Sequence, residues 1–184
     1  MARSLSSSLL GVLALTLVVL QGVLAFIEPG RYLILTEDNR FLSIGPVPLV
    51  YPPIDVPVRL LDRRFQNEAW DLREVEGGFT IRQPGNRRDV YGLIRQKDGA
   101  VFASATSKPQ TWAVNNAGSG LFTIGVANDD LLFTQTPDKF PQVVLEPADG
   151  SDVQRWQFIR IDRDDLHAFG GLYGKSRFNR QCAM

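Results

Sequence analysis

The sequence predicts an all-β fold built from three similar four-stranded units, and three observations indicate it. Three segments open with a glycine that is followed by an aromatic-x-isoleucine strand. Each segment closes with a strand that contains one tryptophan, and these lie 42 and then 44 residues apart at Trp70, Trp112 and Trp156. The stretches between them alternate apolar and polar residues and are bounded by turn residues, which is typical of strands.

The elements follow in order from this alternation. The opening strands contain Gly30-Arg31-Tyr32-Leu33-Ile34, Gly78-Phe79-Thr80-Ile81 and Gly120-Leu121-Phe122-Thr123-Ile124. We expect four strands in each unit, at 31–36, 40–44, 56–60 and 69–73, then 79–82, 89–94, 101–103 and 111–115, then 121–126, 131–135, 142–145 and 155–161. Turn-forming residues separate them, for example Glu37-Asp38-Asn39 and Lys97-Asp98-Gly99. No segment after residue 25 shows a long helical period.

Three four-stranded units predict a β-trefoil, in which half of the strands form a barrel and the others form hairpins that cap it. A four-bladed propeller would need a further unit. Because one unit cannot bury its own apolar face, we expect Tyr32, Phe79, Phe122 and the three tryptophans to meet near a threefold axis in the core. The alternative for the tryptophans is a role as platforms on which sugars stack.

Composition excludes several function classes. The 184 residues include 20 basic and 20 acidic side chains, so the net charge is zero, and no long basic run is present to hold nucleic acid. One cysteine cannot form an internal disulfide or a structural zinc site, and one histidine disfavours a catalytic triad. We therefore expect neither an enzyme nor a protein that binds a cofactor or metal.

The first 25 residues are typical of a secretory signal peptide. Arg3 precedes an apolar run from Leu9 to Leu20, and small residues end the segment at Ala25. Cleavage there predicts a secreted domain at 26–163. We also expect this domain to be a monomer. The alternative is an uncleaved membrane anchor.

The last residues, 164–184, lie outside the repeats and predict a flexible tail. Cys182 is either free or paired with another chain. His167 and Cys182 match a nucleophile and its base by residue type alone, so we expect no catalysis from them.

Two short motifs and one longer stretch resemble known families. Gln110-Thr111-Trp112 and Gln154-Arg155-Trp156 match the Gln-x-Trp signature of ricin-B-type lectins. Over residues 28–162 the chain more closely resembles the fungal β-trefoil serine protease inhibitors of the cospin type. The stretches that match are 30–34, 57–61, 70–73, 76–81, 101–103, 112–114 and 156–162. This resemblance implies a β-trefoil that occludes a protease active site and performs no chemistry of its own.

One segment has the properties of an inhibitory loop. Residues 45–57 contain five prolines and no asparagine or glycine after Gly45. Each proline fixes its own φ and biases the preceding residue toward extended backbone, so the loop loses little entropy when it binds. The apolar residues Leu49, Val50 and Tyr51 have no other evident purpose on a secreted surface. The alternative is a loop that merely covers the mouth of the barrel.

The resemblance implies that this loop enters the specificity pocket of the protease in at least some family members. Inhibitors of trypsin present Arg or Lys, and residues 45–57 contain neither. We therefore expect a chymotrypsin-like or subtilisin-like target that contacts Pro48, Leu49, Val50, Tyr51 and Pro52. Leu49 is preferred in the pocket over Tyr51, because a scissile bond after Tyr51 would place Pro52 on the leaving side.

Basic residues in other turns are secondary candidates for a protease contact. They are Arg87, Arg88 and Lys139, each of which also fits a solvated turn tip.

The alternative function is that of a carbohydrate-binding lectin of the ricin-B type. Polar residues near the first hairpin of each unit would contact sugar hydroxyls, at Asp38 and Asn39, Asn86 and Asp89, and Asn128 to Asp130. No aromatic residue recurs beside them. A third option is a trefoil that signals or inhibits cysteine proteases.

Overall fold

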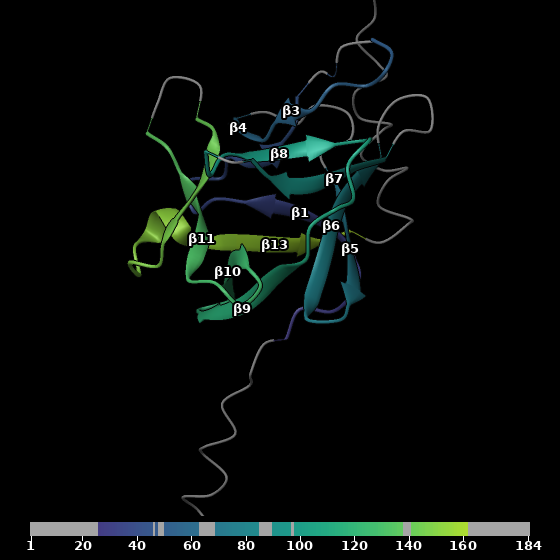
Figure 1. Cartoon of the computed structure of the whole chain (residues 1–184). Helices are drawn as coiled ribbons and strands as arrows, with labels where there is room; N and C mark the ends of the chain where they lie inside the picture. The colour runs from purple at the N-terminus through teal and green to yellow at the C-terminus, as the bar shows by residue number, and fades with distance from the viewer. Residues whose placement is uncertain are drawn as a thin grey trace, which may run out of the picture.

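The computed structural model describes residues 26–45, 47, 50–62, 69–84, 90–96, 98–137 and 141–161. These residues form strands and one short 3-10 turn, with no α-helix among them, so the predicted all-β class is confirmed (Figure 1). Within the same residues, no helix is long and apolar enough to cross a membrane. The elements are β1 (Gly30–Leu35), β2 (Phe41–Ser43), β3 (Val56–Pro57), β4 (Arg59–Leu61), β5 (Trp70–Val75), β6 (Gly78–Pro84), β7 (Val90–Arg95), β8 (Val101–Ser104), β9 (Trp112–Gly118), β10 (Leu121–Val126), β11 (Leu131–Gln135), β12 (Val143–Pro147), η2 (Asp152–Gln154) and β13 (Trp156–Arg160).

Six of the strands close into a ring. Strand β1 pairs with β13 and with β5, β5 pairs with β6, and β13 pairs with β10. Strand β9 completes the ring because it pairs with both β6 and β10. All of these pairs are antiparallel. A closed barrel leaves no free sheet edge, and Figure 1 shows its first and last strands, β1 and β13, side by side.

Six of the other strands form three hairpins outside the ring, β2–β4, β7–β8 and β11–β12, and β3 pairs with β8. Backbone hydrogen bonds join the three hairpins to one another through Val58, Val101 and Val143. The Val58 N–H donates to the Val101 carbonyl at 3.0 Å, and the Val143 N–H donates to the Val58 carbonyl at 3.1 Å. All three valines are fully buried. The hairpins therefore form one connected cap.

The three tryptophans are core residues. Each is completely buried, and each donates its indole Nε1–H to a backbone carbonyl: Trp70 to Leu42 at 2.8 Å, Trp112 to Leu93 at 3.3 Å and Trp156 to Phe133 at 3.2 Å. The predicted structural role is confirmed. A buried ring cannot act as a platform for a sugar, so the alternative role of these tryptophans is excluded.

Two expectations about the core need refinement. Tyr32 and Phe122 are buried as expected, but Phe79 is only partly buried and packs against the main core. The single strand expected at 56–60 is two strands, because β3 pairs with β8 whereas β4 pairs with β2. The physical reason is that Val58, between them, directs its N–H to the Val101 carbonyl and its own carbonyl to Val143.

Gly78 is the glycine whose replacement we expect to disturb the barrel most directly. Its φ is +148°, and a Cβ atom there would lie 2.3 Å from the Trp112 carbonyl oxygen. Gly78→Ala should therefore lower the free energy of unfolding by about 1 to 3 kcal/mol in a urea titration. Gly77→Ala is the matched control, since Gly77 also has positive φ but no atom within 4 Å of such a Cβ. Equal losses for the two variants would show that the clash contributes nothing.

Candidate functional site

The longest connection in the cap lies between β2 and β3. It spans twelve residues, whereas five separate β7 from β8 and seven separate β11 from β12. We call residues 45–57 the proline-rich loop. In Figure 1 its described part continues from β3 as a blue trace at the top of the molecule, away from the barrel. The fold therefore presents this loop at one end.

The tip of the proline-rich loop is apolar and exposed. Tyr51 is 96% exposed, and Val50 and Ile54 are 48% and 49% exposed. Pro52 is also exposed, and the Tyr51–Pro52 peptide bond is cis. None of residues 50–54 carries a charge. Residues 50–54 thus offer an uncharged apolar surface to solvent.

The predicted contact residues are placed only in part. Val50, Tyr51 and Pro52 lie together at the tip, whereas Pro48 and Leu49 fall outside the described residues. Ile54, which is half exposed beside them, was not among the predicted contact residues. Its signal in the sequence is an apolar side chain that directly follows two prolines in the same run.

The fold holds the proline-rich loop on both sides of its tip. We call the side that begins at Gly45 the first limb and the side that ends in β3 the second limb. Gly45 begins the loop with a φ of +63°, and its N–H donates to the Ser43 hydroxyl at 3.0 Å. Val47 packs against the main core. At the other limb, Val56 pairs with Ala103 of β8. The loop is therefore anchored on both sides of an exposed tip.

The secondary candidates and part of the lectin set have no described geometry. Arg87, Arg88 and Lys139, Asn86 and Asp89, and His167 and Cys182 all lie outside the described residues.

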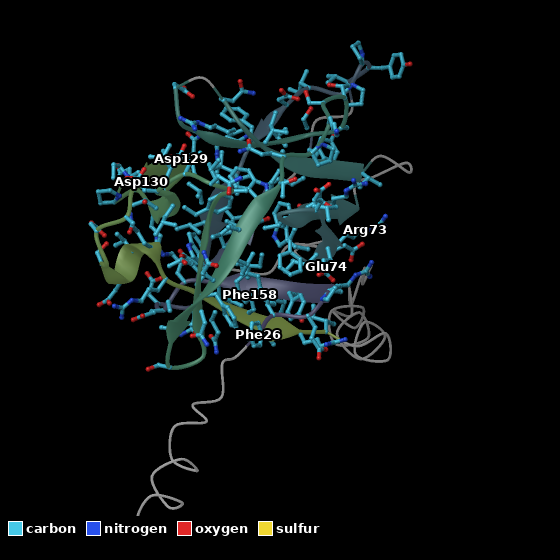
Figure 2. The ribbon with its side chains drawn as sticks, turned by 60° about the horizontal axis from the view of Figure 1, so that its bottom comes forward. Phe26, Arg73, Glu74, Asp129, Asp130 and Phe158 are labelled. Carbon is cyan, nitrogen blue, oxygen red and sulfur yellow. The ribbon has the colours of Figure 1, made fainter. Side chains whose placement is uncertain are left out.

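Two of the described acidic candidates for sugar contacts, Asp38 and Asp129, are bonded to neighbouring groups of the chain. Asp38 accepts hydrogen bonds from the Thr36 hydroxyl and from Arg40 Nε, the latter at 2.7 Å. Asp129 pairs with Arg95 at 3.4 Å and also accepts the Asp130 N–H at 2.9 Å. Figure 2 shows Asp129 and Asp130 at the turn between β10 and β11. These carboxylates organise turns.

We expect Asp38 to make the stability of the fold depend on pH. Desolvation by itself raises the pKa of Asp38, but the hydrogen bond from Thr36 and the charge and hydrogen bond of Arg40 together lower that pKa below its usual value. A carboxyl whose pKa is lowered by folding stabilises the fold above its unfolded pKa and loses this effect as the pH falls through its folded pKa.

We therefore expect Asp38→Asn to reduce the loss of stability on acidification, measured as the urea midpoint between about pH 5 and about pH 2. Glu37→Gln removes a neighbouring exposed carboxylate and is the control. Identical acid profiles for wild type and Asp38→Asn would contradict this assignment.

The comparisons with known proteins concern the fold. No family model and no curated protein sequence matches the chain. The designed threefold-symmetric protein ThreeFoil has a TM-score of 0.59 and 16% identity over 72% of this chain and 99% of its own. A proteinase inhibitor from Coprinopsis cinerea has a TM-score of 0.57 and 18% identity over 74% of this chain and 100% of its own.

A lectin is equally similar. The ricin B-like lectin of Macrolepiota procera, solved with lactose, has a TM-score of 0.57 and 15% identity over 74% of this chain and 100% of its own. These structures support a β-trefoil fold. Because an inhibitor and a lectin share it to the same degree, function has to be argued from the surface.

Proposed function

We propose that this chain is a secreted β-trefoil inhibitor of serine proteases, which blocks the active site reversibly with the tip of the proline-rich loop. The observation on which the proposal depends is the apolar, uncharged tip around Tyr51, which projects from anchored limbs. In this proposal residues 1–25 are a cleaved signal peptide, 26–163 form the inhibitory domain, and 164–184 form a tail. The protein is a monomer and has no catalytic activity of its own.

The proposal includes a pseudo-threefold axis that relates three four-stranded units. Strand register supports it, because an aromatic residue early in each unit pairs with a tryptophan. The pairs are Tyr32 with Trp70, Phe79 with Trp112 and Phe122 with Trp156. The three indole hydrogen bonds also support the axis, since each reaches the second strand of the corresponding unit.

Inhibition by this loop requires no reaction of its own. Anchored limbs leave little conformational freedom to lose, so more of the contact energy contributes to affinity. An apolar pocket of a chymotrypsin-like or subtilisin-like enzyme fits Leu49 or Tyr51, whereas the acidic pocket of trypsin requires a basic residue that residues 45–57 lack. The proposed target is therefore an enzyme that prefers apolar residues.

The lectin alternative has less support from the described surface. Sugar recognition at the first hairpins would need free polar groups and an adjacent exposed aromatic ring. The Asp38 and Asp129 carboxylates are engaged, and the tryptophans are buried. The bonded carboxylates and the buried tryptophans are therefore our reason for proposing the inhibitor before the lectin.

The test is residual activity of chymotrypsin, subtilisin and trypsin after titration with the chain from Phe26 onward. We expect inhibition of chymotrypsin or subtilisin, no inhibition of trypsin, and loss of inhibition in the Leu49→Gly/Tyr51→Gly double variant. Val153→Gly, which changes an exposed apolar residue in η2, is the control. Inhibition of trypsin alone would move the site to Arg87, Arg88 or Lys139. No inhibition by about 10 µM protein would overturn the proposal, and binding to lactose would then support the lectin.

A further inference from the structure

We infer that Gln96 is a positioning residue for the proline-rich loop, and that it acts by holding Asp55 at the base of the loop's second limb. This inference rests on the proposed function of the tip. The Gln96 side-chain amide, Nε2, donates a hydrogen bond to Asp55 Oδ2 at 3.3 Å, and both side chains are partly buried. Gln96 lies in the connection between β7 and β8, 41 residues away along the chain.

The backbone of Gln96 is fixed on both sides. Its N–H donates to the Ala100 carbonyl at 2.9 Å, and its carbonyl accepts the Gly99 N–H at 3.0 Å. The Asp98 carboxylate closes the same turn by accepting the Ala100 N–H at 3.1 Å. The Gln96 side chain therefore extends from a hydrogen-bonded turn, so Asp55 is bonded to a residue whose backbone is held in place.

A backbone hydrogen bond also joins this turn to another hairpin of the cap. The Gly99 carbonyl accepts the Leu145 N–H of β12 at 2.8 Å. One residue beyond Asp55, Val56 pairs with Ala103 of β8. The second limb is thus fastened to the β7–β8 hairpin at two adjacent points, and that hairpin is fastened to β12. Asp55 lies four residues after Tyr51, so the outermost of these two points is the Asp55–Gln96 contact.

This location determines what the contact does. Without the Asp55–Gln96 hydrogen bond, the attachment of the second limb nearest to the tip would be the pairing of Val56 with Ala103. Asp55 would then be free to move with the tip. A looser loop loses more entropy when it binds and adapts more easily to the cleavage geometry of a protease. Loss of the contact should therefore weaken inhibition and accelerate cleavage of the loop by about threefold to tenfold each, which is the range for one ordinary hydrogen bond.

The experiment compares Gln96→Ala, Asp55→Ala and the double variant with wild type. We expect each single variant to raise Ki and to speed loop cleavage, and we expect the double variant to be no worse than either single variant. Asp55→Asn should keep the wild-type behaviour, because its amide oxygen can still accept from Gln96 Nε2. Gln135→Ala is the matched control: it removes a part-buried glutamine that accepts from Arg40 at 3.0 Å, in a bond that does not involve the loop.

Two readouts separate this inference from the proposed function. Ki against chymotrypsin or subtilisin tests both, whereas the rate at which thermolysin cuts residues 45–57 reports the loop alone. Suppose that wild type inhibits neither enzyme, but that thermolysin cuts Gln96→Ala and Asp55→Ala faster than Gln135→Ala. The positioning role of Gln96 is then supported, and the proposed inhibitor function is overturned. If both variants match Gln135→Ala in Ki and in cutting, or if Asp55→Asn behaves like Asp55→Ala, the inference is overturned. Melting temperatures identify any variant that is globally destabilised.

Discussion

Replacement of Trp156 by alanine is expected to lower the free energy of unfolding by about 3 to 5 kcal/mol. The ring is fully buried, packs edge-on against Phe133 with centroids 6.3 Å apart, and donates a hydrogen bond to the Phe133 carbonyl. Truncation would leave a cavity and a buried carbonyl without its partner. Because domains of this size are stable by only about 5 to 15 kcal/mol, much of the stability would be lost. Urea titration followed by circular dichroism measures the effect.

Trp156→Phe is the companion variant, and it keeps the result interpretable if the alanine variant does not fold. Phenylalanine fills most of the space but cannot donate to the Phe133 carbonyl. We expect a smaller loss, about 1 to 3 kcal/mol, because an acceptor loses its donor and a smaller cavity forms. A loss below about 1 kcal/mol in Trp156→Ala would contradict the assignment of this tryptophan to the core.

Replacement of Tyr51 by alanine is expected to raise Ki for the inhibited protease by at least about 30-fold, which corresponds to a hot-spot loss of about 2 kcal/mol. Tyr51 is the most exposed of the large apolar side chains in the described residues, and a rigid aromatic ring provides much contact area at little entropic cost. The melting temperature should stay unchanged, since the ring makes almost no contact with the fold. Ki from progress curves is the measurement.

Ile54→Ala provides the comparison for Tyr51→Ala, because Ile54 is half exposed on the same loop. We expect a smaller rise in Ki. An unchanged Ki for Tyr51→Ala, together with a large rise for Leu49→Ala, would show that Leu49, the residue preferred in the pocket on the sequence alone, is the principal contact and that Tyr51 contributes little. An unchanged Ki for Tyr51→Ala, Ile54→Ala and Leu49→Ala would show that the tip does not contact the protease.

Much of the fold could be predicted from the sequence because its signals are local and repeated. Period-two alternation located the strands, and the spacing of Trp70, Trp112 and Trp156 identified the residues that meet in the core. The split between β3 and β4 was not predictable in this way. It depends on Val58 bonding to Val101 and Val143, which are distant in the sequence, and no local pattern specifies such partners.

The candidate site was predictable only as a loop. Its prolines and apolar residues are visible in the sequence. The hydrogen bond between Gln96 and Asp55 is not, because these are common surface residue types that meet only after folding. Function is harder to predict from the sequence than the loop is. The apolar core residues that produce the resemblance to inhibitors are the same ones that any β-trefoil needs, so they do not distinguish an inhibitor from a lectin.

The most direct test of the account is equilibrium binding of the protein to chymotrypsin, or to subtilisin if that is the enzyme inhibited. Binding to the free enzyme is compared with binding to the same enzyme after a peptidyl chloromethyl ketone has filled its specificity pocket. If the loop tip occupies the active site, the free enzyme binds one molecule of this protein and the blocked enzyme binds at least about 100-fold more weakly, a difference of about 2.7 kcal/mol. Equal affinity for the free and the blocked enzyme would contradict the account, because the protein would then bind outside the active site.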